Sequence, residues 1–269
     1  MDEHGDAPGW PGIPPAWTSS AKDGIGTTLS TGGSRIWFTL GHGVLNEIYW
    51  PRIDSPQVRD IGFIVADDRG FWSEVKREAH YRLETPAPGI PAYRITHDHD
   101  RFTLHLDICC DPERDVLLIH ARLTASEPLR LYVLIAPHLG NSGTHNTAWT
   151  TKLEDDIILL AQRGVANLAV AARDGARGGF ARASAGFVGM SDGWQDFFHN
   201  GRMTWEYQQA RDGNVALLGE LASPEATIAV GFGDTPELAT TLAVSSLQFR
   251  FEQAWTSYGA AWQEWQARL

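Results

Sequence analysis

Short segments with strand character recur about every ten residues between Thr27 and Gly233, and this rhythm constrains the fold more than any other feature. Within segment 102–109, apolar residues alternate with polar ones, as on a strand that buries one face. Turn signals rich in Asp and Gly separate the segments. Because no helical pattern alternates with them, the sequence predicts an all-β fold, a sandwich or a barrel. The predicted strands are Ser34–Thr39, Asp60–Ala66, Tyr93–His97, Phe102–Cys109, Asp115–Ala125, Arg130–Ala136, Ile157–Arg163, Leu168–Ala172, Met203–Tyr207, Val215–Glu220 and Glu225–Phe232.

The N-terminal part of the chain breaks this rhythm. It includes the proline-rich stretch APGWPGIPPAW, and proline cannot donate a hydrogen bond to a strand ladder. We therefore expect an extended arm over residues 1–26, followed by a β domain over residues 27–234.

The last part of the chain, residues 235–269, has a helical pattern. Apolar residues recur at helical spacing over residues 236–251, and Asp234 or Thr235 can cap the first turn. In the closing stretch FEQAWTSYGAAWQEWQARL, four aromatic residues share one helical face: Trp255, Tyr258, Trp262 and Trp265. Such a face needs a surface to pack on, so we expect a helical linker that contacts another part of the protein.

The overall charge argues against some classes of partner. The chain carries a formal net charge of −11, and its Lys and Arg residues do not cluster. Binding to nucleic acid or to an anionic membrane depends on basic patches, so we expect neither partner. In addition, no apolar run approaches the roughly 20 residues that a membrane-spanning helix needs.

Two further features bear on the location of the protein. The first residues, MDEHGDAPGWPG, are acidic and lack the apolar core of a signal peptide. The two cysteines, Cys109 and Cys110, are adjacent, and a disulfide between neighbours would close a strained ring. We expect a cytoplasmic protein, with a mature secreted form that has lost its leader as the alternative.

Tryptophan is abundant, with 11 residues in the chain. Because the indole ring packs in cores and also stacks on sugars, we expect most of these residues in the core or at an interface. Trp149 and Trp194 stand beside polar residues in expected loops, which favours a ligand-binding surface for these two.

The stretch LGHGVLNEIYWPRIDSPQVRDIGFIV is dense in polar and aromatic residues. We expect Arg52 and Arg59 to pair with Asp54 and Asp60 at a corner under a loop. Such density suits a ligand rim or a buried network at a domain interface, and we prefer the interface. The candidates for carbohydrate binding or a domain interface are Glu47, Tyr49, Trp50, Arg52, Asp54, Trp149, Trp194, Trp255, Trp262 and Trp265.

Three carboxylates, Asp192, Asp196 and Glu206, lie in the stretch SDGWQDFFHNGRMTWEYQQA. Carboxylate pairs act as acid and base in glycosidases, but we interpret SDGW first as a tight turn whose Asp accepts backbone N–H groups. His97 and His99 have a spacing that can bind metal, yet no third ligand is near them in sequence. The sequence therefore predicts no catalytic residue, no metal site and no cofactor.

Several motifs taken together resemble a known family. They are APGWPGIPPAWTSSAKDGIGT, SRIWFTLGHGVLNEIYWPRIDSPQVRDIGFIVADDRGFWSEVKRE, LYVLIAPHLGNSGTHNTAW, GFVGMSDGWQD and MTWEYQQARDGNVALLGEL. In this order they resemble the N-terminal domain of the bacterial glucoamylases and glucodextranases of glycoside hydrolase family fifteen. The resemblance covers essentially the whole chain.

The resemblance implies a large antiparallel β-sandwich of the super-sandwich, galactose-mutarotase-like type, followed by a helical linker. In the family, an (α/α)-barrel comes next, and two of its glutamates hydrolyse α-glucosidic bonds with inversion. Because this chain ends where that barrel is expected to begin, none of its glutamates is expected to be catalytic. We expect a non-catalytic accessory domain that docks against and stabilises a catalytic barrel, in cis or in trans.

Two alternative functions stay open at this point. The first is a free-standing carbohydrate-binding module, in which Trp149 and Trp194 stack on α-glucan oligosaccharides. The second is mutarotase-like catalysis, in which His42, His138 or His145 exchanges protons with the anomeric centre of a sugar.

Overall fold

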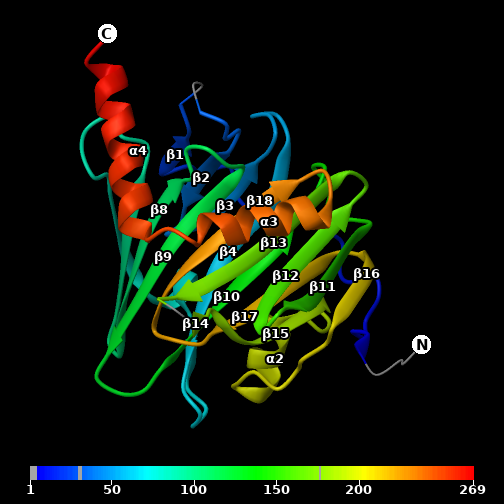
Figure 1. Cartoon of the computed structure of the whole chain (residues 1–269). Coiled ribbons are helices and arrows are strands. Elements are labelled where there is room, and N and C mark those ends of the chain that lie inside the picture. The colour runs from blue at the N-terminus through cyan, green and yellow to red at the C-terminus, as the bar shows by residue number, and fades with distance from the viewer. Residues whose placement is uncertain (1–4, 30–31, 176) are drawn as a thin grey trace.

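The computed structural model describes residues 5–29, 32–175 and 177–269. Two antiparallel sheets form its body (Figure 1). The eight-stranded sheet has the order β1 (Gly24–Thr27), β2 (Trp37–Gly41), β3 (Val44–Tyr49), β4 (Pro56–Ala66), β10 (Arg130–Pro137), β17 (Val215–Leu221) and β15 (Phe180–Phe187), with β5 (Trp72–Glu74) paired to β4. The ten-stranded sheet has the order β16 (Gln209–Gly213), β11 (Asn146–Leu153), β12 (Asp156–Arg163), β13 (Ala166–Asp174), β18 (Glu225–Gly233), β9 (Val116–Ala125), β8 (Phe102–Cys110), β7 (Tyr93–His99) and β6 (His80–Glu84), with β14 (Arg177–Gly178) paired to β13.

Alternate residues of both sheets form one continuous apolar core. Phe63, Val133 and Leu217 come from the neighbouring strands β4, β10 and β17 of the eight-stranded sheet. Ile119 and Val170 come from β9 and β13 of the other sheet, and all five are at most 1% exposed. This packing of two sheets through their inner faces confirms the predicted antiparallel sandwich.

The helix α3 (Pro236–Ser246) lies across the outer face of the ten-stranded sheet (Figure 1). A side chain at Gly231 would lie 2.6 Å from the carbonyl oxygen of Ala239, and one at Gly233 would lie 2.8 Å from its amide nitrogen. Glycine at these two positions of β18 therefore allows the helix to approach the sheet closely. Thr235, one of the two predicted caps, accepts a hydrogen bond from the amide of Leu238 at 3.2 Å.

The helix α4 (Phe251–Gln266) is separate from α3. The predicted helix over residues 236–251 is therefore wrong at its end, because α3 stops at Ser246. Arg250, just before α4, is extended, with φ −69° and ψ 141°. This change of direction allows Phe251 to stack on His120, with ring centroids 5.0 Å apart.

Two helices interrupt the strands, α1 (Val75–Glu78) and α2 (Gly193–Asn200), although the sequence analysis expects no helix there. The predicted strand Met203–Tyr207 is also wrong, since β16 begins only at Gln209. The amides of Thr204 and Trp205 donate to the carboxylate of Asp196, at 2.6 and 2.7 Å, and not to a neighbouring strand. The buried carboxylate of Asp196 thus accepts hydrogen bonds from backbone N–H groups that would otherwise bond to a neighbouring strand.

The proline-rich segment runs beside β15 and β16 and is held by hydrogen bonds. The amide of Ala7 donates to Gln209 O at 2.8 Å, and the amide of Asn214 donates to Pro11 O at 2.8 Å. The indole N–H of Trp10 donates to Asp212 O at 2.9 Å. The segment therefore packs on the edge of the sandwich through its carbonyl groups and its few amides.

Two histidines, His97 and His138, are buried in the fold. His97 is fully buried and His138 is 1% exposed. The pKa of each imidazole is lowered from 6.5 to about 4, chiefly because burial removes it from water. For His138 the nearby Arg59 also lowers the pKa while Asp60 raises it, and for His97 the Gly43 backbone and Asp98 oppose the effect of burial. Both side chains are therefore neutral in the folded protein at pH values where they are protonated in the unfolded chain.

We predict that the free energy of unfolding falls as the pH falls from about 6.5 to about 4. Both pKa values are lowered by folding, so the unfolded chain binds the extra protons and the stability is complete only above pH 6.5. Each histidine contributes up to about 1.4 kcal/mol per pH unit in this window.

Urea unfolding at several pH values measures how steeply the free energy of unfolding depends on pH. Replacing His138→Gln should flatten the slope relative to wild type. Equal slopes for H138Q and wild type would contradict this account.

Candidate functional site

Two of the candidate residues, Glu47 and Tyr49, point outward from β3 and form a closed polar cluster. The Tyr49 hydroxyl donates to Glu47 Oε2 at 2.6 Å, and Lys22 Nζ lies 2.7 Å from the same oxygen. Burial raises the pKa of Glu47, but the hydrogen bonds from Lys22 and Tyr49 outweigh burial and hold it below its usual value. The carboxylate is thus ionised and already has partners within the chain.

The corner between β3 and β4 has a buried part and an exposed part. Trp50 is 4% exposed and stacks on Phe232, with ring centroids 6.1 Å apart, so it packs in the core. Arg52 lies at the surface and donates to both carboxylate oxygens of Asp54, at 3.0 and 2.8 Å. The predicted pairing at this corner is confirmed for these two residues, and Arg59 pairs with Asp60 at 3.3 Å.

The prediction that Trp149 and Trp194 lie in loops is wrong for both, and the two residues lie over different sheets. Trp149 is in β11, half-buried against the core. Trp194 is in the first turn of α2, where its ring stacks on Phe198 at 5.3 Å and lies under the Arg77 guanidinium, also at 5.3 Å. The indole N–H donates to Glu74 Oε2 at 2.7 Å. The two indole rings therefore do not form one stacking surface.

The three carboxylates of the SDGW region each have a structural partner. Asp192 caps α2 by accepting the amide of Gln195 at 3.0 Å. Asp196 is fully buried and accepts hydrogen bonds from the amides of Thr204 and Trp205, in the segment that follows the helix. Burial raises the pKa of Asp192 although backbone amides oppose it. The prediction that Asp192 accepts backbone N–H groups is confirmed, and the turn is the start of a helix.

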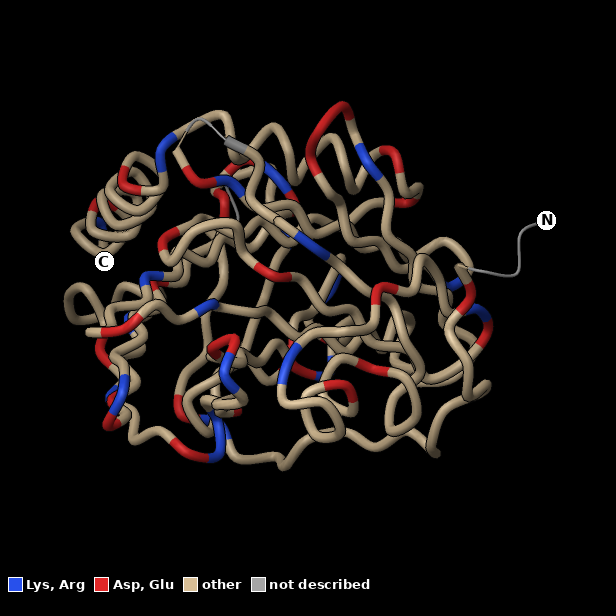
Figure 2. The backbone as a smooth tube through the Cα atoms, turned by 90° about the horizontal axis from the view of Figure 1, so that it is seen from below, with Lys and Arg blue, Asp and Glu red and all other residues tan. Residues whose placement is uncertain are grey.

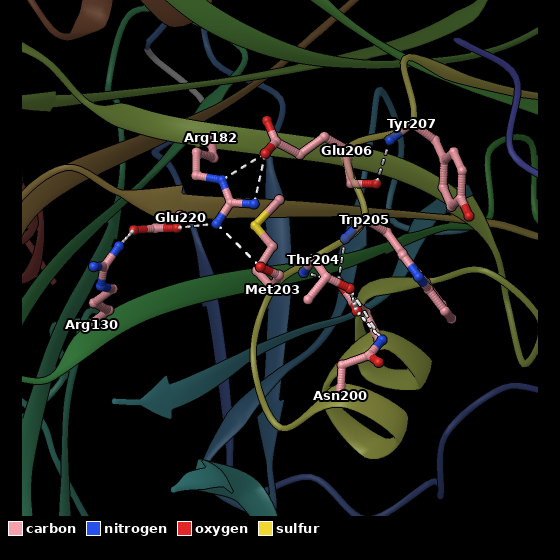
Figure 3. Close-up of polar contacts among 11 residues, drawn as sticks. Arg130, Arg182, Asn200, Met203, Thr204, Trp205, Glu206, Tyr207 and Glu220 are labelled. Atoms are coloured by element: carbon pink, nitrogen blue, oxygen red, sulfur yellow. Dashed lines mark hydrogen bonds and ion pairs between the residues drawn. The ribbon is translucent and has the colours of Figure 1, made fainter. Parts of the chain in front are cut away.

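Glu206 belongs to an ion-pair network on the outer face of the eight-stranded sheet (Figure 3). Arg182 donates to Glu206 Oε1 at 2.8 Å and to Met203 O at 3.2 Å. The buried Glu220 lies beside it and accepts from Arg130 at 2.8 Å. These side chains come from the adjacent strands β10, β17 and β15, so the network ties the edge of the sheet to the segment after α2.

The histidines considered for catalysis have separate partners. Nε2 of His42 lies 2.9 Å from Ser19 Oγ, and Nδ1 of His145 lies 2.7 Å from Asp212 Oδ1. His138 is buried and packs edge-on against Trp17, with ring centroids 4.8 Å apart. The described contacts do not join the three imidazoles in one site.

The aromatic face of α4 is buried in part. Tyr258 is 2% exposed, and its hydroxyl donates to the carbonyl oxygens of Thr27 and Pro91, the second at 3.0 Å. Trp255 and Trp262 are half-buried against the core. Trp265 is 45% exposed and packs edge-on against Trp262. The stripe thus anchors α4 to the sandwich through Tyr258 and leaves its far end exposed.

A cavity of about 310 Å³ opens on the outer face of the eight-stranded sheet, beside α2. Its walls include Trp194 among the candidates, together with Arg59 and Lys76, which were not among the candidates for binding. The cavity could not be predicted from the sequence, because its residues come from different strands. They become neighbours only when these strands pair in the observed register. The signal that could have revealed it is a set of small residues at outward positions of adjacent strands.

Charged residues are interspersed along the described chain, with basic and acidic residues often close together (Figure 2). Arg82 pairs with Asp98 at 2.5 Å, and Arg94 pairs with Asp107 at 2.6 Å. Among the residues that the structure describes, no three His, Cys, Asp or Glu side chains gather closely enough to hold a metal ion. Within the same residues, no helix has the length and apolar character needed to cross a membrane.

Comparison with known proteins places these features in a family. A glucoamylase from Clostridium sp. (strain G0005) is 27% identical over 264 residues, which are 95% of this chain and 37% of that protein. The crystal structure of a bacterial glucoamylase complexed with acarbose superposes with a TM-score of 0.90 at 27% identity, over 97% of this chain and 39% of that chain. This chain therefore spans under two fifths of the length of either relative. The family model for domain N of glucodextranase matches residues 7–267, so the chain belongs to the glucodextranase domain N family.

Proposed function

We propose that this chain is a non-catalytic domain that docks against and stabilises the catalytic domain of a glucoamylase-type α-glucan hydrolase, in cis or in trans. Membership of the domain N family supports the proposal, since both glucoamylase relatives extend well beyond the matched region. Residues 235–269 would then act as the linker next to that partner. The main observation in support of a docking surface is the exposed aromatic side chain of Trp265 near the end of α4.

The proposed docking surface consists of α4 and the turn before it. Phe249 in this turn is 56% exposed and Trp265 near the end of α4 is 45% exposed. Exposed aromatic rings of this size favour a protein contact, because burying them removes a large apolar area from water. The corner with Arg52 and Asp54, where Ile53 is also exposed, is the second part of the interface that we propose.

The fixed position of α4 supports the same proposal. Phe251 and Tyr258 are buried seven residues apart, two turns along the same face of the helix. Near the end of the helix, the side-chain amide of Gln266 donates to Gly89 O at 2.6 Å. Because α4 is held at both ends, Trp265 is presented in a defined place. A partner would meet a pre-ordered surface, which lowers the entropic cost of docking.

We predict that this chain binds the catalytic part of the Clostridium sp. glucoamylase, meaning the portion outside its matched region, when the two are mixed. Analytical ultracentrifugation should show a one-to-one complex, and the catalytic part should unfold at a higher temperature in it. Phe249→Glu and Trp265→Glu should each weaken binding at least tenfold, because each buries a charge at the interface. Leu153→Glu, which places a charge at an exposed apolar position of β11, is the matched control.

A hybrid glucoamylase that carries this chain in place of its own matched region gives a second measurement. The hybrid should be thermally destabilised by W265E and not by L153E. The docking proposal would be abandoned if the isolated chain is a monodisperse monomer that binds no hydrophobic dye, forms no complex with the catalytic part, and gives hybrids that are insensitive to W265E.

We also predict that the isolated chain does not hydrolyse α-glucans. The resemblance assigns hydrolysis to glutamates of the catalytic domain, while Glu47, Glu206 and Glu220 of this chain are engaged in ion pairs. Release of glucose from maltotriose, followed over hours with an enzymatic glucose assay, tests this. Turnover that co-purifies with the chain and is lost on substitution of one of these glutamates would refute it.

A further inference from the structure

The cavity beside α2 exists because its floor is made of small residues. Gly62, Ala136 and Ala216 line it from the adjacent strands β4, β10 and β17. A Cβ atom built at Gly62 would meet no heavy atom within 4 Å, so the space above this residue is open. Farther along the same face, Tyr132 and Leu218 fill the equivalent space under α2, where they pack on Phe197. The hollow is thus a local feature of the sequence and not a general gap under the helix.

The walls of the cavity carry balanced charge. Three cationic and three anionic side chains line it: Arg59, Lys76, Arg77, Asp60, Glu74 and Asp192. Arg77 pairs with Glu74 at 2.7 Å, and Asp192 is used as the cap of α2. The cavity is therefore lined by both donors and acceptors, without an excess of charge of either sign.

Two of these cations have unused hydrogen-bonding capacity. Lys76 Nζ lies 4.0 Å from Asp60 Oδ2, which is too long for a hydrogen bond. The Nε–H of Arg59 is buried and has no hydrogen-bond partner among the described residues, although Nη2 of the same side chain reaches Asp60 at 3.3 Å. The Nε–H of Arg59 is closed to solvent, so Lys76 is the cation whose free donors a ligand in the cavity can use.

The remaining walls are apolar. Trp194 of α2, Leu134 of β10 and Ile13 of the N-terminal segment line the cavity beside the charged groups. The occupant must therefore present both carbon-bound hydrogens and hydrogen-bonding groups. The volume of about 310 Å³ is near the lower limit of small-molecule sites. The occupant is then a small molecule and not a long chain segment.

We propose that this cavity is a binding site for an uncharged sugar, with room for one or two pyranose rings. Sugar hydroxyls both donate and accept, which suits paired guanidinium, ammonium and carboxylate groups, while the C–H groups of the ring suit Leu134, Ile13 and the small apolar floor. An inorganic anion would meet three carboxylates, and an apolar ligand would leave the Lys76 ammonium, which is 4.0 Å from Asp60 Oδ2, without a hydrogen-bond acceptor. The balance of charge therefore selects a neutral polyhydroxylated ligand.

This site is independent of the proposed docking function. The cavity lies on β4, β10, β17 and α2, whereas the proposed docking surface lies on α4 and the corner between β3 and β4. Substitutions in one place leave the other intact, so loss of sugar binding and loss of docking can be observed separately.

The indole N–H of Trp194 provides a probe inside the cavity. Its NMR cross-peak can be assigned by its absence in Trp194→Phe, and the full chain is then titrated with D-glucose, maltose and inorganic phosphate. We expect a saturable shift of this peak with glucose or maltose at millimolar concentration and none with phosphate. No saturable shift with either sugar at about 50 mM, or a shift with phosphate alone, would overturn the proposal.

Gly62→Val tests whether the sugar occupies the cavity itself. The new side chain enters open space on a strand, so the protein should stay folded while sugar affinity falls at least tenfold. Gly259→Ala adds a methyl group to a glycine of α4, where the nearest atom would be 3.7 Å away, and should leave affinity unchanged. Lys76→Met, on the short helix α1, removes a donor without filling the cavity and should also weaken binding. Unchanged affinity in both G62V and K76M would refute the site.

Discussion

The contact between α3 and β18 determines where the C-terminal part of the chain can lie. A two-sheet sandwich buries its inner faces but leaves two outer faces, and α3 covers much of one of them. Gly231 and Gly233 permit this close contact, since any larger side chain would meet the backbone of Ala239. The turn after α3 then directs α4 so that Phe251 reaches His120. The position of α4, and with it that of Trp265, therefore depends on Gly231 and Gly233 of β18, which are distant from Trp265 in the sequence.

Much of the fold could be predicted from the sequence because β8 alternates apolar and polar residues and because β9, β10 and β18 contain short apolar runs bounded by turn residues. Strands β8, β9, β10 and β18 lie close to their predicted ranges. Strands β1, β3, β5, β6, β11, β14, β15 and β16 fall outside the predicted strands, and many of them are short or lie at a sheet edge, where burial imposes less pattern. The helix α2 had a usable signal, since Asp192 caps its start and Gly201 ends it in the left-handed conformation with φ 66°. The sequence instead predicts a tight turn here, because α2 is short and is bounded by Gly193 and Gly201.

The site was less predictable than the fold because side-chain partners depend on register. Pairing of Arg52 with Asp54 follows from their spacing, but Trp50 in the same stretch turns inward and stacks on Phe232. Stacking of Trp194 on Phe198 follows from their spacing only once α2 is recognised as a helix, and nothing local indicates that Glu74, 120 residues away, accepts the indole N–H. Loop tryptophans suggest a ligand surface only when one ring face is free, and that depends on residues from other elements.

The two outer faces of the sandwich are covered by different helices, α3 on the ten-stranded sheet and α2 on the eight-stranded sheet. The small residues beneath or beside each helix have different consequences. On the ten-stranded sheet, α3 packs directly on Gly231 and Gly233 of β18, so no space remains between helix and strand at these two positions. On the eight-stranded sheet, α2 covers Tyr132 and Leu218 but stops short of Gly62, so an unfilled floor remains beside charged walls. Small residues thus have opposite effects in the two places. Under α3 they admit a helix, and beside α2 they leave a space that only a ligand or water can occupy.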